Sequence, residues 1–194
     1  MSELTESEDN IFAPPGGILV WIIMAIEFFT FLMGIFYFYA EKTKNLNLFH
    51  EMQKSMSLKI AIINTVVLVT SGFFVANAVS FYKSKNRIKT LECLGISIFL
   101  GALFLLLKGF EYYQKIELGH TMDSNIFYNL YWFLTLFHYF HVVVGVGLLC
   151  YFTIQIKKKT QSWEFLGPLE AGATLWHMCD LIWILIFPTL YLLR

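Results

Sequence analysis

Ionisable side chains inside long apolar stretches are the residues of this sequence best suited to chemistry. His177 and Asp180 lie three positions apart near the C-terminus, so a helix places both on one face. His138 and His141 repeat that spacing in an earlier stretch, and Glu27 lies in the middle of the first one. Such residues suit haem ligation, a di-metal carboxylate centre or a proton relay.

The spacing of the histidines limits what metal they can bind. His138 and His141 share one helix face, so they cannot bind opposite sides of one iron. One bis-histidine haem that uses His177 remains arithmetically possible, because His50 and His120 fall outside the apolar stretches. A di-metal bundle requires Glu-x-x-His pairs on two helices, and the sequence does not offer two within its apolar stretches. A haem b-bearing membrane anchor therefore stays open as one alternative function.

A transporter and a purely structural network are the other interpretations of these residues. Intramembrane ionisable groups commonly serve transport, but transporters also show internal repeats, and the apolar stretches show none. A polar network that fixes the register of packed helices uses the same residues and needs no substrate. The spacing alone does not separate these two interpretations.

Composition assigns the chain to the integral membrane proteins. Of its residues, 57% are hydrophobic, 18% aromatic and only 14% charged, and the mean hydropathy is +0.61. The apolar stretches are continuous rather than alternating, which is typical of spanning helices and not of a barrel. The formal net charge is zero, so no basic surface indicates nucleic acid as a partner. The three cysteines form no C-x-x-C pair and predict neither a disulfide framework nor a thiolate metal site.

The apolar stretches predict an all-α fold, an integral membrane bundle of five transmembrane helices. Each stretch reaches the roughly 20 residues that cross a bilayer core. The predicted spans are residues 17–40, 58–81, 91–113, 127–152 and 170–193, within one domain at 17–194. Residues 1–16 form an acidic tail whose charge is opposite to that of a secretory signal, so we expect it to stay uncleaved.

Two local patterns predict how the second and third spans pack. Asn64 and Ser71, seven residues apart and followed by Gly72, predict a contact stripe with hydrogen bonds between helices. Lys108 and Glu111 predict a local ion pair whose long side chains reach water at the end of the third span.

The last span is marked by two prolines and two tryptophans. Pro168 suits a helix start and would place Glu170 in the first turn, whereas Pro188 removes a backbone donor and should bend the last turns. Trp176 and Trp183 lie seven apart and should pack beside the polar stripe of this helix.

The positive-inside rule chooses the orientation of five spans. With the N-terminus in the cytoplasm, the cytoplasmic loops contain seven basic residues and the segments on the other side contain six. The inner set is Lys83, Lys85, Arg87, Lys89, Lys157, Lys158 and Lys159, and the outer set is Lys42, Lys44, Lys54, Lys59, Lys115 and Arg194. The inner residues are clustered, so we expect a cytoplasmic N-terminus and a C-terminus on the opposite side.

Five motifs follow one another along the chain. They are the first span with Glu27, Asn64-Thr65 followed by Thr70-Ser71-Gly72, Leu107 to Tyr112, Phe137 to Val142, and Glu170 with Trp176 to Trp183. Together they resemble subunit III of the haem-copper oxidases, the family of cytochrome c oxidase and quinol oxidase subunits. Mitochondrial-type members have seven helices, so the chain resembles the short five-helix bacterial form. Two branches share that form, one in oxygen-reducing oxidases and one associated with nitric oxide reductase, and the motifs suit both.

The resemblance implies an accessory subunit of the bacterial cytoplasmic membrane. Such a subunit holds no cofactor or metal of its own, packs against catalytic subunit I, which carries haem and copper, binds phospholipid in a cleft, and supports proton uptake and sustained turnover in aerobic electron transport. The site residues implied, a buried polar network beside the lipid cleft, are Glu27, Glu111, His138, His141, Glu170, His177 and Asp180. Asn64, Ser71, Gly72 and Trp183 are the residues expected to pack the helices.

Overall fold

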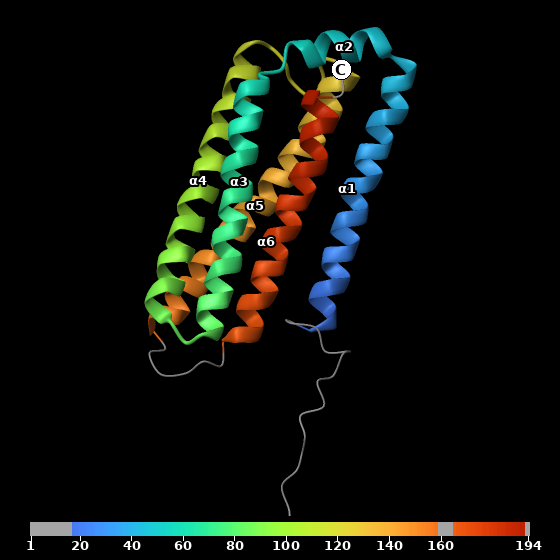
Figure 1. The fold of residues 1–194 in the computed structure, drawn as a ribbon. Helices are drawn as coiled ribbons and strands as arrows, with labels where there is room; N and C mark the ends of the chain where they lie inside the picture. Colours follow the sequence, from blue (N-terminus) through green and yellow to red (C-terminus); the bar gives the residue numbers. More distant parts are fainter. Residues whose placement is uncertain (1–16, 159–164, 193–194) are drawn as a thin grey trace, which may run out of the picture.

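The computed structural model describes residues 17–158 and 165–192, so the acidic tail predicted at 1–16 lies outside the described residues. Within these ranges, five helices are long and apolar enough to cross a membrane. They are α1 (Ile18–Lys44), α3 (Leu58–Lys83), α4 (Arg87–Glu117), α5 (Ile126–Lys158) and α6 (Leu166–Phe187). The predicted all-α bundle of five membrane helices is thereby confirmed (Figure 1).

The helices extend past the apolar stretches from which they were predicted. α4 has 31 residues and α5 has 33, which corresponds to about 46 and 50 Å at 1.5 Å per residue. A hydrocarbon core is about 30 Å thick, so their polar ends project from it. Hydropathy finds the apolar part of such a helix, whereas backbone hydrogen bonding continues into the polar turns on either side.

A short helix that hydropathy did not predict, α2 (Leu46–Lys54), lies across one end of the bundle between α1 and α3 (Figure 1). It is amphipathic, and its own Phe49 and Gln53 side chains are buried against the bundle. The Phe49 ring lies 5.1 Å from that of Phe38 on α1 and 5.4 Å from that of Phe127 on α5, measured between centroids. α2 therefore caps the end of the hydrophobic core.

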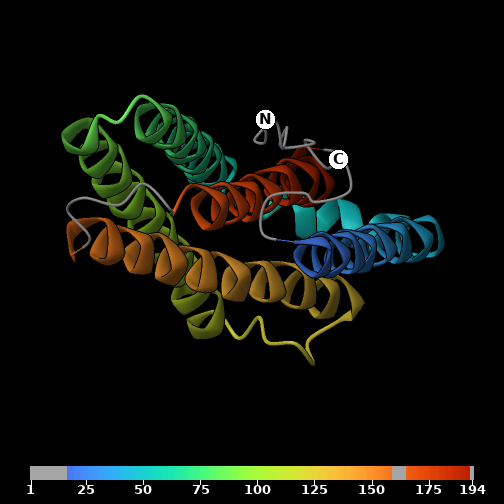
Figure 2. The same cartoon turned by 90° about the horizontal axis from the view of Figure 1, so that it is seen from below.

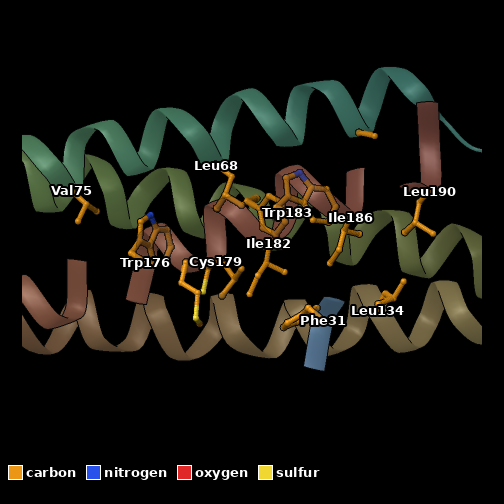
Figure 3. Packing of buried hydrophobic residues seen from close by; sticks show 14 of the residues in the cluster. Phe31, Leu68, Val75, Leu134, Trp176, Cys179, Ile182, Trp183, Ile186 and Leu190 are labelled. Carbon is orange, nitrogen blue, oxygen red and sulfur yellow. The ribbon is translucent and has the colours of Figure 1, made fainter. Parts of the chain in front are cut away.

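α6 is the central helix of the bundle. Viewed along the helices, it lies between α3 and α1, with α5 along one side (Figure 2). Trp176 and Trp183 are both fully buried, and Figure 3 shows the side chains of α6 between α3 and α5. A Cβ at Gly145 would lie 2.8 Å from the Trp176 ring, so this glycine lets α5 approach the indole closely.

The C-terminal end of α6 changes geometry at Pro188. The α-helix ends at Phe187, and Pro188–Leu192 continues as a π-helical turn, η1, rather than as the predicted bend in an α-helix. The carbonyls in the last turn of a helix have no donor within the helix and need another partner. Gln53 of α2 supplies one, since its Nε2 donates to Thr189 O (2.9 Å).

Candidate functional site

The ionisable residues of the spans form separate clusters rather than the single network expected from the sequence. Glu27 and His141 form one pair, and Lys108 and Glu111 form a second. His177 and Asp180 form a third on α6, and Glu170 pairs instead with a lysine of α3. His138 is buried by itself among aromatic rings.

Glu27 of α1 faces His141 of α5, as expected for a carboxyl group near the middle of a span. Glu27 Oε2 lies 3.3 Å from His141 Nε2, and Nδ1 of the same ring lies 2.8 Å from Phe137 O. A carbonyl only accepts, so Nδ1 carries a proton and donates to Phe137 O. Nε2 is then the nitrogen that can accept a proton from Glu27 or return one to it.

This pair lines an apolar cavity of about 240 Å³ between α1, α5 and α6. The other lining side chains are Ile23, Met24, Phe140, Val144, Leu175 and Met178. Glu27 and His141 keep 30% and 18% of their side-chain surface exposed, so the polar pair is accessible from the cavity. The arrangement combines apolar walls with one exchangeable proton.

His138 lies one turn before His141 but points into the core. Its ring stacks on Trp183 (5.3 Å between centroids, 27° between planes), and the Phe31 and Phe104 rings meet it edge-on. It is fully buried, and both ring nitrogens lack a hydrogen-bond partner within the described residues. Because aromatic rings enclose this imidazole, it does not fit the axial position of a haem.

Lys108 and Glu111 of α4 form a buried ion pair, and the expectation that their side chains reach water is wrong. They keep only 1% and 3% of their surface, and Lys108 Nζ lies 2.9 Å from Glu111 Oε2. Nζ also donates to the hydroxyls of Tyr191 (2.7 Å) and Tyr131 (3.2 Å). Both hydroxyls in turn donate to Glu111 Oε1, at 2.7 and 2.8 Å.

This cluster joins three elements of the fold: α4, α5 through Tyr131, and η1 through Tyr191. The Trp183 ring adds a cation–π contact, 5.2 Å from Lys108 Nζ. Every polar atom of the ion pair has a partner, so burial does not leave an uncompensated charge. The sequence pointed to the ion pair but not to the tyrosines, because a tyrosine in an apolar span shows no sign of its hydroxyl's partner.

His177 and Asp180 lie against Gly72 of α3. His177 Nδ1 is 3.5 Å from Asp180 Oδ2, and a Cβ at position 72 would lie 2.0 Å from that oxygen. Gly72 was expected to pack helices, and here it leaves the space that the Asp180 carboxylate occupies. Asp180 is 7% exposed, whereas the His177 side chain is 42% exposed.

Glu170 lies near the end of the bundle where α6 begins, not among the other acids. Its Oε1 is 2.7 Å from Lys83 Nζ at the end of α3, and its side chain is 22% exposed. α6 begins at Leu166, so Glu170 lies beyond the first turn in which it was expected. The ion pair ties the start of α6 to the end of α3.

The helix-packing residues of α3 are buried, but not all are bonded as expected. Ser71 Oγ donates to Ser97 O (3.0 Å), and Ser97 Oγ donates to Ser71 O (3.2 Å), which joins α3 to α4. Trp183 Nε1 donates to Thr65 Oγ1 (3.0 Å). Asn64 is fully buried without a hydrogen-bond partner in the described part of the chain, so its expected bond across helices is missing.

Comparison with known proteins assigns the family. The family described as "Cytochrome c oxidase subunit III" matches residues 15–194. A probable cytochrome c oxidase subunit 3 of Nocardia farcinica is 28% identical over 183 residues, which are 92% of this chain and 87% of that protein. Cytochrome c oxidase subunit 3 of Rhipicephalus sanguineus is 27% identical over 180 residues, 90% of this chain and 68% of the relative.

The match to a third relative covers a smaller share of that relative's length. Cytochrome c oxidase subunit 3 of Loxodonta africana is 35% identical over 135 residues, 69% of this chain, and the match spans half of the elephant protein. With the family match over almost all of the sequence, the chain belongs to the cytochrome c oxidase subunit III family. It is thus a multi-pass membrane subunit whose family implies partner subunits.

Proposed function

From its membership of this family, we propose that the chain is the accessory, metal-free subunit III of a bacterial haem-copper terminal oxidase in aerobic respiratory electron transport. The observation that carries the proposal is the family match from residue 15 to residue 194. The relatives' names, all cytochrome c oxidase subunits, favour an oxygen-reducing complex over the nitric oxide reductase branch. The catalytic subunit I would be the partner that holds haem and copper.

The side chains of the chain support an accessory role. Within residues 17–158 and 165–192, no three histidine, cysteine, aspartate or glutamate side chains gather as metal ligands do. His138 is enclosed by aromatic rings, and His141 is engaged with Phe137 and Glu27. Redox chemistry then belongs to other chains of the complex.

The cavity beside Glu27 is our candidate for a phospholipid site. Its walls are apolar, as an acyl chain requires, and it lies between α1 and the rest of the bundle. Glu27 follows the start of α1 by nine residues, which places it about 14 Å along the helix and so within the hydrocarbon layer. An acyl chain in this cavity would keep water away from the Glu27–His141 pair.

The Glu27–His141 pair is our candidate for supporting proton uptake. With Nδ1 held by Phe137 O, the pair shares one proton between Glu27 Oε2 and His141 Nε2. In the first form Glu27 donates from its hydroxyl to a neutral imidazole, and in the second a carboxylate faces an imidazolium. Interconversion moves only the proton between two atoms that lie 3.3 Å apart, so the pair can pass a proton from one residue to the other without rearranging the helices.

Substitution of Glu27 by glutamine separates a proton-exchanging role from a packing role. The amide still donates a hydrogen bond to His141 Nε2 but cannot give up a proton. We expect Glu27→Gln to assemble normally and to lose activity faster than wild type during prolonged turnover, with slower proton uptake. Full activity over many turnovers would show that the pair serves packing alone. Thr30→Ala on the same helix is the control, since Thr30 donates only to Ile26 O.

We place the N-terminus in the cytoplasm. The described members of the basic cluster lie at the end of the bundle where α3 meets α4 (Figure 1); they are Lys83, Lys85, Arg87, Lys89, Lys157 and Lys158. At the other end, Lys42 Nζ donates to Gln53 Oε1 (3.1 Å), and Lys44 pairs with Glu41 (2.7 Å). Lys115 is buried there, so among the described residues fewer basic side chains face solvent at that end. An alkaline phosphatase fusion within residues 118–125 should be active, and one within 84–86 inactive; the reverse pattern would invert the orientation.

A further inference from the structure

The uncovered face of α6 carries a polar side chain, His177, at a depth where side chains that face lipid are normally apolar. His177 follows the start of α6 by eleven residues, about 16 Å along the helix and near the middle of the span. Its side chain is 42% exposed, although polar groups at this depth normally face the bundle interior. Leu181, Ile184 and Leu185 continue the same face at 56%, 43% and 37% exposure.

A groove runs beside His177 between α3 and α6. Its volume is about 340 Å³, and small or polar side chains dominate its lining. The lining residues are Ala76, Val79, Glu170, Ala173, Thr174 and His177. Small residues let helix backbones approach closely within a membrane, and polar side chains hydrogen-bond across such contacts. The groove therefore has the composition of a helix–helix interface.

The outer face of α1 provides the contrast. Its exposed residues are large and apolar, as lipid contact requires, and include Phe29, Met33 and Phe36 at 65%, 67% and 70% exposure. Thr30, a polar residue on this helix, is satisfied by the carbonyl of Ile26 in its own helix. By comparison, the α6 face presents an imidazole edge that its own helix does not satisfy.

Asp180 determines which edge of His177 faces outward. Its Oδ2 lies 3.5 Å from Nδ1, and Gly72 leaves the space that holds the carboxylate there. A proton on Nδ1 directed at Asp180 leaves Nε2 as an acceptor at the exposed edge. Acyl chains offer no donor, and a second copy of this chain would set one imidazole acceptor against another.

We propose that the α3/α6 groove, defined by the six lining residues, docks a transmembrane helix of the larger, haem-carrying subunit, which presents a hydrogen-bond donor side chain to His177 Nε2. The proposal rests on the proposed function, because that function supplies the partner. It assigns the lipid-binding cavity and the partner-binding groove to different sides of α6.

Site-specific photocrosslinking tests the docking face without destabilising the bundle. A photoreactive phenylalanine analogue replaces Ala76, which is exposed in the groove, or Met33, which is exposed on α1, in a tagged chain expressed with its complex. We expect irradiation of intact membranes to yield an adduct with the haem-carrying subunit, identified by mass spectrometry, at position 76 and not at 33. An adduct at 33 alone, no adduct at 76, or a dimer of this chain at 76 would overturn the proposal.

Variants of His177 test the hydrogen bond itself. Loss of one intramembrane hydrogen bond of roughly 1–2 kcal/mol corresponds to about a tenfold weaker association, so His177→Leu should reduce co-purification of the large subunit accordingly. His177→Gln retains an acceptor near the Nε2 position and should restore most of the co-purification. Thr30→Leu should leave the amount of co-purified large subunit unchanged. Equal recovery with His177→Leu and wild type would refute the hydrogen bond. If wild type itself brings down no haem-carrying subunit, the proposed function fails instead.

Discussion

Replacement of Lys108 by methionine should destabilise the bundle strongly. The change removes three hydrogen bonds, to Glu111, Tyr131 and Tyr191, and leaves the Glu111 carboxylate buried with two hydroxyl donors and no cation. Breaking a buried ion pair from one side costs about 3–5 kcal/mol. For a chain of this length each kcal/mol shifts the unfolding midpoint by about 2–4 °C, so we expect a drop of about 6–20 °C.

The double variant isolates the ion pair from the loss of packing. Lys108→Met combined with Glu111→Gln removes both charges, so the remaining hydroxyls face a neutral amide. Its destabilisation should be smaller than the sum of the two single changes by about 2–3 kcal/mol. Additive effects would show that the two side chains do not interact in the folded protein.

Thermal unfolding in mild detergent, followed with a thiol-reactive dye, is a suitable assay because Cys93 and Cys179 are buried and become reactive only on unfolding. Lys44→Met is the matched control. Lys44 pairs with Glu41 at the same three-residue spacing, but its side chain is 66% exposed, so its loss should leave the unfolding midpoint nearly unchanged. Equal midpoints for Lys108→Met and Lys44→Met would refute the account of the buried cluster.

Three further predictions concern single positions. Gly72→Ala should lower the unfolding midpoint, because the added Cβ would lie 2.0 Å from Asp180 Oδ2 and displace that side chain. Gly147→Ala is the control and should raise the midpoint slightly, since no atom lies within 4 Å of its added Cβ. Equal effects of the two substitutions would contradict the close approach of Asp180 to Gly72. Gln53→Leu leaves two carbonyls of η1 without its amide, so we expect a loss of about 1–3 kcal/mol in the same assay. Burial, and secondly a nearby lysine, lower the pKa of His120 from its ordinary 6.5. The unfolded chain then binds this proton more readily, so stability should fall as pH drops below 6.5, and His120→Gln should remove that part of the dependence.

The sequence predicted the helices of the membrane more completely than their ends. Each apolar stretch became a helix because a span must satisfy its own backbone hydrogen bonds, and this constraint can be read from hydropathy. α2 was missed because nine residues with a mixed composition carry no such signal. Pro188 was recognised as a break, but the hydrogen bond from Gln53 to Thr189 O in the π-helical turn that follows joins residues 136 positions apart in the sequence.

The candidate site shows the same division. The sequence placed Glu27 and His141 in one buried polar network, and the structure brings the two together as a pair, which offsets the cost of a lone carboxylate in hydrocarbon. The separation of His138 from His141 was not predictable, since both occupy one face of α5 and only tertiary packing directs one ring to Trp183. The lysine partner of Glu170 and the tyrosine partners of Lys108 likewise come from other elements, whose packing hydropathy does not specify.

Affinity purification of the tagged chain from its native membrane in mild detergent, with an optical spectrum of the product, tests the central claim most directly. We expect a larger haem-carrying subunit to co-purify in stoichiometric amount. After harsher detergent separates the chain from that subunit, the haem spectrum should remain with the partner and leave this chain colourless. A stoichiometric Soret band that stays with the isolated chain, and that His177→Ala abolishes, would contradict the account and support a membrane cytochrome instead.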